Sequence, residues 1–160
     1  MSTLSTADLQ VITETVQSYF GRLTKERARI SASFLAEAGE ALPEFDYTGT
    51  IQISGAYKGS VYFTAPKLMI RYLLLSVGET LQGDDIFMDT AGEIANTIAG
   101  NARKHFGETM EISVPTTRKS GDAAISGAGR PAHQRPMVIH IQWQALAAAL
   151  VVDLESAAAG

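Results

Sequence analysis

The sequence predicts an α+β fold in which an antiparallel sheet of about six strands packs against long helices. Apolar residues recur at helical spacing in three stretches, residues 5–23, 66–78 and 84–107. Apolar and polar residues instead alternate over several shorter stretches, as they do in strands that bury one face. The short glycine-containing connection at residues 55–59 favours a hairpin, and therefore antiparallel pairing.

Length and composition indicate one domain with its own core. A chain of 160 residues, 46% of them hydrophobic, is large enough to bury about 70% of its unfolded surface. The net charge of −4 argues against a nucleic-acid partner. The absence of cysteine excludes disulfides, thiolate metal sites and cysteine nucleophiles, and fits a reducing compartment. Without an apolar run of about 20 residues or a signal-peptide pattern, we expect a cytoplasmic protein with no membrane insertion.

The first helix is expected over residues 5–23. Ser5 or Thr6 can cap it, and Asp8 lies in its first turn. Its apolar residues form one stripe at helical spacing: Leu9, Ile12, Val16, Tyr19, Phe20 and Leu23. The charged cluster at residues 25–29 then predicts a solvated connection.

The strands follow from alternation. Six are predicted, at residues 30–35, 47–54, 58–64, 111–116, 137–144 and 149–154. Residues 36–44 indicate a loop, and residues 145–148 an alanine-rich turn. Residues 118–136 are rich in glycine, alanine, proline and basic side chains, and predict a long loop or an irregular hairpin.

Two further helices are expected. Pro66 suits the first position of a helix over residues 66–78, whose many leucines predict that it is mostly buried. In the helix over residues 84–107, Asp84 or Asp85 can cap the start and Gly107 can end it. Its apolar face comprises Phe87, Ala91, Ile94, Ile98, Ala102 and His105.

The opposite face of residues 84–107 carries Asp89, Glu93, Asn96 and Gly100, which we call the polar stripe. Its side chains lack basic partners four residues away, so the stripe is not a ladder of ion pairs. Gly92 and Gly100 lie inside the helix, where each costs about 1 kcal/mol relative to alanine. The stripe is either a bare docking surface or a solvated face whose helix uses glycines for packing. Spacing alone favours the solvated face, because most polar stripes have no chemistry.

A family resemblance changes this weighting. Asp89, Glu93 and Asn96, followed by Gly100-Asn101-Ala102, resemble the signature helix of the CheC/CheX/FliY family of chemotaxis response-regulator phosphatases, and the CheX kind in particular. The resemblance covers roughly residues 45–125, including the hairpin. It implies a CheC-like fold and, as for other proteins of the CheX kind, a homodimer.

The resemblance also implies a substrate and a mechanism. The substrate is an aspartyl phosphate on a CheY-like response regulator, which supplies its own Mg²⁺, so the chain needs no cofactor of its own. Asn96 then positions the attacking water, and Glu93 accepts a hydrogen bond from a lysine of the regulator. Asp89 and Gly100 become partner-binding residues, with no mechanistic role assigned to Asp89.

Other kinds of site find little support. His105, His133 and His140 lack metal-ligand spacing, and no nucleophile motif accompanies a histidine. The alternative function is a non-catalytic binding module of the same fold that docks a response regulator or a flagellar switch partner. A small-molecule hydrolase would need a residue set that the sequence does not offer. The Glu93 and Asn96 pair favours the enzyme, since a scaffold does not require an amide at that position.

Overall fold

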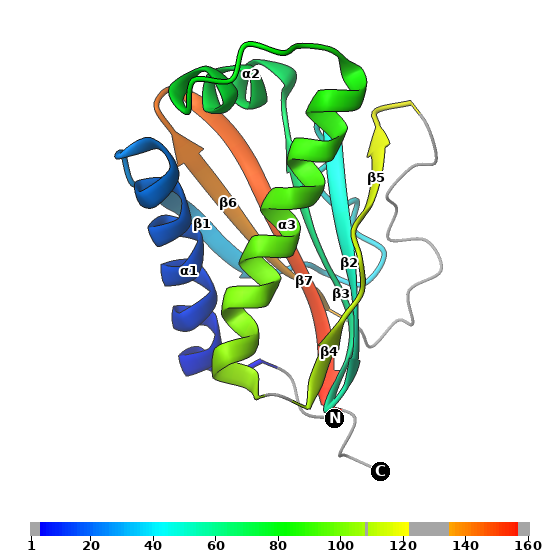
Figure 1. The fold of residues 1–160 in the computed structure, drawn as a ribbon. Coiled ribbons are helices and arrows are strands. Elements are labelled where there is room, and N and C mark those ends of the chain that lie inside the picture. The colour runs from blue at the N-terminus through cyan, green and yellow to red at the C-terminus, as the bar shows by residue number, and fades with distance from the viewer. Residues whose placement is uncertain (1–3, 108, 122–134, 157–160) are drawn as a thin grey trace.

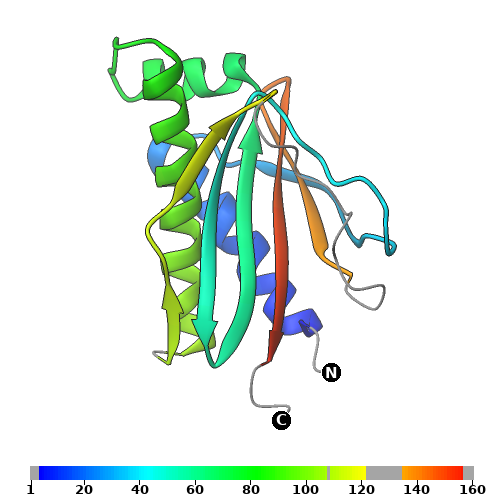
Figure 2. The ribbon, with the colours of Figure 1, turned by 90° about the vertical axis from the view of Figure 1, so that its right-hand side faces the viewer.

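One seven-stranded antiparallel sheet organises the computed structural model, which describes residues 4–107, 109–121 and 135–156 (Figure 1). The helices are α1 (Thr6–Thr24), α2 (Lys67–Ser76) and α3 (Asp84–Phe106). The strands are β1 (Arg29–Leu35), β2 (Tyr47–Gly55), β3 (Tyr57–Ala65), β4 (Met110–Ile112), β5 (Thr116–Lys119), β6 (Met137–Trp143) and β7 (Leu146–Ser156). Helices α1 and α3 lie side by side against the sheet, and α2 lies across one end of it (Figures 1 and 2). The α+β prediction is therefore confirmed.

The sheet has the order β1-β6-β7-β3-β2-β4, with β5 also paired to β2. The predicted strand at residues 111–116 is wrong in detail, because two short strands replace it and raise the count to seven. Ile112 of β4 pairs with Ile53, and Thr116 of β5 pairs with Thr50 farther along the same strand. Pro115 lies between them, and a proline has no N–H to continue the ladder.

Helix α1 begins with a capping box, in which Ser5, one of the two predicted caps, is the N-cap residue. The Ser5 hydroxyl accepts from the backbone N–H of Asp8 at 3.1 Å, and the Asp8 carboxylate accepts from the Ser5 N–H at 2.9 Å. The buried side chains of this helix, Ile12, Val16 and Phe20, belong to the main core. At its other end the indole N–H of Trp143 donates to the Thr24 hydroxyl at 3.2 Å, which satisfies the one polar group of a buried side chain.

Helix α3 buries the face that the sequence predicted, with one exception. Phe87, Ala91, Ile94, Ile98 and Ala102 are buried, whereas His105 is exposed. The His105 Nε2 lies 2.8 Å from the Asp8 carboxylate, so it joins the last turn of α3 to the first turn of α1. Burial raises the pKa of Asp8, but hydrogen bonds from Ser5 and the contact with His105 outweigh burial and lower it.

The predicted aspartate cap of α3 is wrong. Gly83 occupies the N-cap position and no side chain bonds the free N–H groups there. Asp84 accepts instead from the Tyr47 hydroxyl and from the Lys119 ammonium, the latter at 3.0 Å. These two donors lower the pKa of Asp84. Asp84 therefore ties the start of α3 to β2 and β5.

Helix α2 is only half buried, contrary to the prediction. Met69, Ile70, Leu73 and Leu74 enter the core, while Leu68, Tyr72 and Leu75 remain 42–49% exposed. The reason is position: α2 crosses the end of the sheet, so that only one side of it meets the core (Figure 1). Its apolar content alone does not distinguish a helix inside the core from one at its end.

Other predictions concern turns and loops. The predicted turn at residues 145–148 is shorter, because β6 ends at Trp143 and β7 starts at Leu146, with Gln144 at a positive φ of 55°.

In the basic segment, residues 118–136, Arg118 pairs with Glu44 at 2.6 Å and Arg135 pairs with Glu37 at 2.9 Å. Residues 122–134 of this segment, including Arg130 and His133, lie outside the described residues. Among the described helices, none has both the length and the apolar character needed to cross a membrane.

Helix α3 approaches the sheet closely at Gly49 of β2. A Cβ atom on Gly49 would lie 2.5 Å from the carbonyl oxygen of Ala91 and 2.5 Å from the Cα of Gly92. Both distances are far below van der Waals contact, so the backbone of α3 rests directly on the backbone of β2. On its other side, a Cβ on Gly92 would lie 2.8 Å from the Thr117 methyl carbon of β5. Gly92 is therefore a packing glycine.

Gly49→Ala should lower the stability of the protein. The added methyl group meets helix backbone rather than a movable side chain, and overpacking of this kind typically costs about 1–3 kcal/mol. Gly100→Ala is the matched control: its Cβ would meet only the Ile112 Cδ1, at 4.0 Å, so it should stabilise the helix by about 1 kcal/mol. Thermal and urea unfolding measure both. Equal melting temperatures for Gly49→Ala and the wild type would contradict the packing described above.

Candidate functional site

The polar stripe lies on the outer side of α3. The side chains of Asp89, Glu93 and Asn96 are exposed, and Gly100 is partly exposed one turn beyond Asn96. Among the described residues, these three side chains have no hydrogen bond or ion pair with the rest of the chain. The structure therefore brings all four predicted site residues onto one accessible face. Their donors and acceptors point toward whatever approaches α3 from outside.

One flank of the stripe is the segment that joins β4 to β5. Gly92 faces Pro115 and Thr117, and Gly100 faces Ile112, so residues 112–117 follow α3 over the length that holds Asn96 (Figure 2). Val114, in the middle of this segment, is 80% exposed. The stripe is thus bordered on this side by a short apolar ridge.

The other flank is helix α1. Tyr19, Arg22 and Leu23 of α1 and Thr97 and Asn101 of α3 line a hollow of about 360 Å³ between the helices. Burial raises the pKa of Tyr19 to about 12, and the negative charge of Glu93 contributes to the rise. Glu93 therefore lies close enough to α1 for its charge to act on that helix. A tyrosine with this pKa stays neutral at physiological pH.

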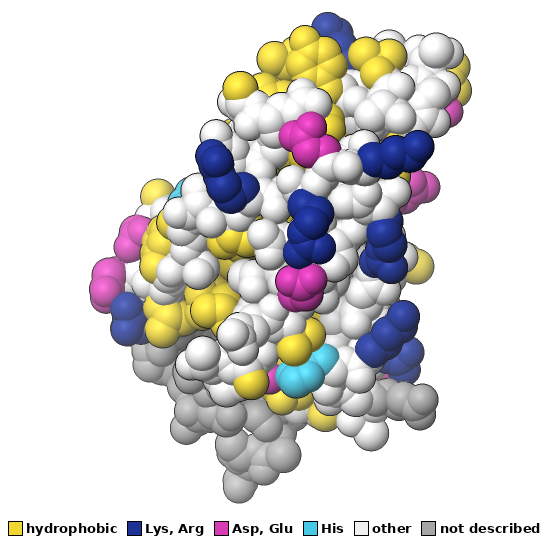
Figure 3. Space-filling model, turned by 90° about the vertical axis from the view of Figure 1, so that its left-hand side faces the viewer, with side chains coloured by type: hydrophobic (Ala, Val, Ile, Leu, Met, Phe, Trp, Pro, Cys, Tyr) yellow, Lys and Arg dark blue, Asp and Glu magenta, His cyan; other side chains and the backbone are white. Residues whose placement is uncertain are grey.

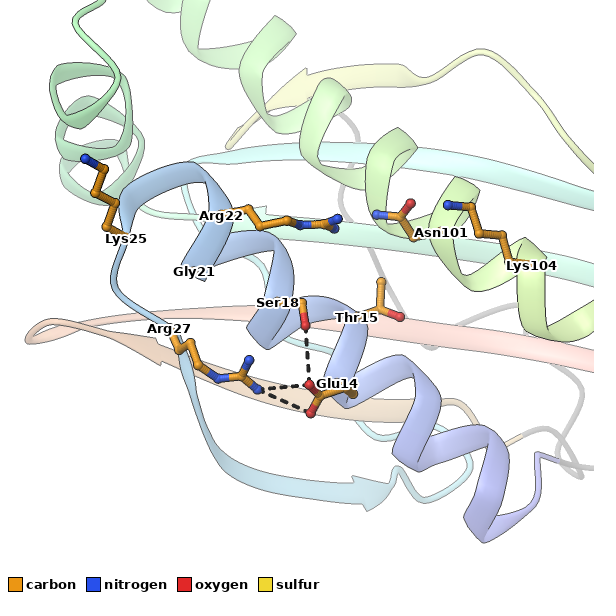
Figure 4. A pocket seen from close by; sticks show the side chains of 9 residues that line it. All are labelled: Glu14, Thr15, Ser18, Gly21, Arg22, Lys25, Arg27, Asn101 and Lys104. Carbon is orange, nitrogen blue, oxygen red and sulfur yellow. Dashed lines mark hydrogen bonds and ion pairs between the residues drawn. The ribbon is translucent and has the colours of Figure 1, made fainter.

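A second hollow, of about 540 Å³, continues from the first along the same two helices (Figure 4). Arg22 and Asn101 line both hollows, and Lys104 lies one turn beyond Asn101 in the second. We call the two hollows together the interhelical groove. Its residues are Glu14, Thr15, Ser18, Tyr19, Gly21, Arg22, Leu23, Lys25, Arg27, Thr97, Asn101 and Lys104.

The charge of the groove differs from that of the stripe. Among its lining residues are four cationic side chains, Arg22, Lys25, Arg27 and Lys104, and one carboxylate, Glu14. Arg27 is paired with Glu14 at 3.1 Å. Figure 3 shows Lys and Arg side chains following one another down this face of the molecule. A basic surface therefore borders an acidic stripe in a chain whose net charge is −4.

The stripe supplies polar groups rather than a complete catalytic set. An asparagine side chain both donates and accepts hydrogen bonds and carries no charge, so it can hold a water near an anionic group without repelling that group. A glutamate accepts hydrogen bonds and suits a cationic partner. Among the described residues, no three metal-ligating side chains gather in one place. The arrangement can therefore orient a reactant that another molecule brings.

Reasoning from the sequence did not find the groove. Arg22 and Lys104 are far apart in the chain, and nothing in the sequence says which faces of the first and third helices meet. The available signal was a polar side of the first helix, with Glu14, Ser18 and Arg22 at helical spacing. That pattern also suits an ordinary solvated face.

Comparison with solved structures supports the fold. A CheC-like superfamily protein from Shewanella sp. PV-4 is similar with a TM-score of 0.79 and 16% identity, over 96% of this chain and 100% of the other. The chemotaxis protein CheX from Vibrio vulnificus gives 0.78 and 15%, over 93% and 99%. The structure of a CheX–CheY–BeF3–Mg²⁺ complex from Borrelia burgdorferi gives 0.66 and 12%, over 92% and 97%. At these identities the likeness concerns the fold alone.

Sequence comparison gives the family. No curated protein sequence matches the chain significantly. The family model described as chemotaxis phosphatase CheX, however, matches residues 47–142, which is more than half of the chain and includes the whole polar stripe. On this match, and with the antiparallel sheet and the signature helix that the structure presents, the chain belongs to the CheX family.

Proposed function

We propose that this protein dephosphorylates a CheY-type response regulator, with Asn96 positioning the attacking water and Glu93 fixing the regulator in place. The observation that carries the proposal is the free face of α3, where Asp89, Glu93 and Asn96 are exposed and form no side-chain bond within the described chain. Family membership gives that face its meaning, because the family is one of chemotaxis phosphatases. The CheX structure from Borrelia burgdorferi contains CheY, which supports a partner of this kind.

The reaction is hydrolysis of an acyl phosphate. The water oxygen forms a bond to phosphorus while the bond from phosphorus to the aspartate oxygen breaks, giving a free carboxylate and inorganic phosphate. The Asn96 carbonyl oxygen accepts a hydrogen bond from the water, and its amide can donate to a phosphoryl oxygen. Mg²⁺ belongs to the regulator in this scheme. The contribution of this chain is position and hydrogen bonding rather than covalent chemistry.

Glu93 has a separate task. It lies one turn before Asn96 on the same face and accepts a hydrogen bond from the active-site lysine of the regulator. That contact sets the distance between the two proteins, so that the amide of Asn96 reaches the phosphoryl group. Gly100, one turn beyond, keeps side-chain bulk away from the approaching surface. Asp89 belongs to the same contact surface.

The alternative is a binding module of the same fold that docks a regulator without hydrolysing its phosphate. The exposed stripe fits both functions, and the neutral amide at position 96 is what favours the enzyme. The two differ in one measurement, the loss of phosphate from a regulator with and without this protein.

We further propose a cytoplasmic homodimer, as other proteins of the CheX kind form, and sedimentation of the purified chain measures its mass.

Asn96→Ala should remove most of the catalysis while leaving docking intact. The side chain is exposed and makes no bond within the described chain, so its loss should leave the melting temperature unchanged. A water without its acceptor is poorly oriented, and we expect a fall of about 100-fold in the dephosphorylation rate. Asn96→Asp should fail as well, because a carboxylate repels the phosphoryl oxygens. Full activity in Asn96→Ala would rule out the assigned role.

Glu93→Ala should weaken binding to the regulator by about 10- to 100-fold, since a hydrogen bond between charged groups contributes roughly 1.5–3 kcal/mol. Glu93→Gln keeps an acceptor oxygen and should retain part of the affinity. Titration against a regulator loaded with Mg²⁺ and a beryllofluoride phosphoryl mimic measures both variants. If both bind as tightly as the wild type, Glu93 does not hold the lysine.

Gly100→Leu should abolish docking in a protein that remains folded. The space beside Gly100 is open within the described chain, so a larger side chain disturbs no internal packing and projects toward the partner. Melting and dephosphorylation on the same sample separate the two effects. Wild-type activity in Gly100→Leu would show that the regulator does not approach this turn of α3.

A further inference from the structure

The interhelical groove, defined above, has an unmatched positive charge. The Glu14 carboxylate forms an ion pair with Arg27 at 3.1 Å and accepts a hydrogen bond from the Ser18 hydroxyl at 3.3 Å. It therefore does not neutralise the other cations that line the groove. Arg22, Lys25 and Lys104 form no ion pair or side-chain hydrogen bond with the described residues. Unpaired cations on one surface attract an acidic partner most strongly where they lie close together.

Arg22 and Lys104 face the same space. Figure 4 shows the guanidinium of Arg22 reaching from α1 toward Asn101 of α3, with the ammonium of Lys104 beyond it. Lys25 points away from this pair at the far end of the groove. The groove therefore contains a polar row of Arg22, Asn101 and Lys104. Its two cations can only donate hydrogen bonds, and the amide of Asn101 lies between them.

The groove adjoins the stripe. Thr97 and Asn101 line it, and each directly follows a stripe residue in the chain, Asn96 and Gly100 respectively. The charge of Glu93 reaches Tyr19 on the α1 side of the groove. A protein that covers Glu93 and Asn96 also covers surface around them, because a stable protein interface extends over about 800 Å² on each partner, and the groove is one of the two flanks of the stripe.

We infer that Arg22 and Lys104 form a second contact for the response regulator, and that they bind an acidic segment, carrying Asp or Glu side chains, on its surface. This inference rests on the proposed function. Glu93 is matched by a lysine of the regulator, but Asp89 adds a second carboxylate beside a reacting group that is itself an anion. The cations of the groove offset that repulsion and orient the partner before Asn96 reaches the phosphoryl group.

The two contacts divide the work. Glu93 and Asn96 act at the reacting centre, while Arg22 and Lys104 act on association. Charged groups at the rim of an interface change the association rate and its dependence on salt more than the chemistry. Loss of the groove cations should therefore raise KM and leave kcat nearly unchanged, whereas loss of Asn96 should lower kcat.

The test is the double charge reversal Arg22→Glu/Lys104→Glu, with Arg22→Gln/Lys104→Gln as the neutral version. Lys58→Glu is the matched control for one reversed charge. Lys58 follows Tyr57, whose ring lies 4.9 Å from Phe106 of α3, so strand alternation places Lys58 on the opposite face of the sheet. Affinity for a CheY-type regulator loaded with Mg²⁺ and beryllofluoride, and kcat and KM for dephosphorylation, are measured at about 0.02 M and 0.3 M salt.

We expect the double reversal to weaken binding at least tenfold at low salt and the neutral version by a smaller factor. The affinity of both variants should depend less on salt than that of the wild type. Their kcat should stay within twofold of the wild-type value, and their melting temperatures should be unchanged. Lys58→Glu should change affinity by less than twofold. If the double reversal binds like the wild type, the groove is not a contact, whatever the fate of the proposed function.

The outcomes separate the two proposals. If the wild-type protein binds the regulator without hydrolysing its phosphate, the proposed phosphatase activity is wrong. The affinities of the variants still test the groove in that case. A wild-type protein that binds no CheY-type regulator overturns both. A fall in kcat at unchanged KM in the double reversal would assign these cations to the reacting centre and overturn their role in association.

Discussion

The contact between the backbones of α3 and β2 determines where the residues of the polar stripe lie. Gly49 and Gly92 have no side chains, and the helix therefore rests on the strand with the Gly92 Cα within 2.5 Å of where a Gly49 Cβ would stand. Such an approach fixes both the height of the helix above the sheet and its rotation about its own axis. Phe87, Ile94 and Ile98 then point into the core, and the residues on the far side of the helix must face solvent.

This constraint explains why α3 contains a glycine that lowers its own helical stability. The cost of about 1 kcal/mol at Gly92 is offset by packing on both sides, against β2 beneath and β5 beside it. Gly100 has no such compensation within the described chain, since its only neighbour would be a methyl group at 4.0 Å. Both glycines look alike in the sequence, because each lies inside the helix. Only Gly92 is explained by packing within the described chain.

The sequence predicted those parts of the fold that local periodicity encodes. Side chains within a single segment determine three such features. These are the start of α1, the buried face of α3, and the alternation of apolar and polar residues in β2 and β3. The errors share a different origin. Whether α2 is covered on both sides depends on where it crosses the sheet, and the partners of Asp84 are Tyr47 and Lys119, which lie in other strands. Tertiary neighbours decide these points, and no local pattern contains them.

The same distinction applies to the site. The stripe could be predicted because one helix carries all of it, and the family resemblance supplied roles for its residues. The groove could not, because it exists only where α1 and α3 meet. Its position nevertheless answers a physical question that the stripe leaves open. In the proposed reaction the acidic stripe approaches an acyl phosphate and needs positive charge close by, and neither Asp89 nor Glu93 has a cation four residues away on its own helix. Arg22 of α1 and Lys104 in the last turn of α3 line the adjoining groove, so in the proposed complex the stripe keeps its carboxylates while the surface beside it attracts an anionic partner.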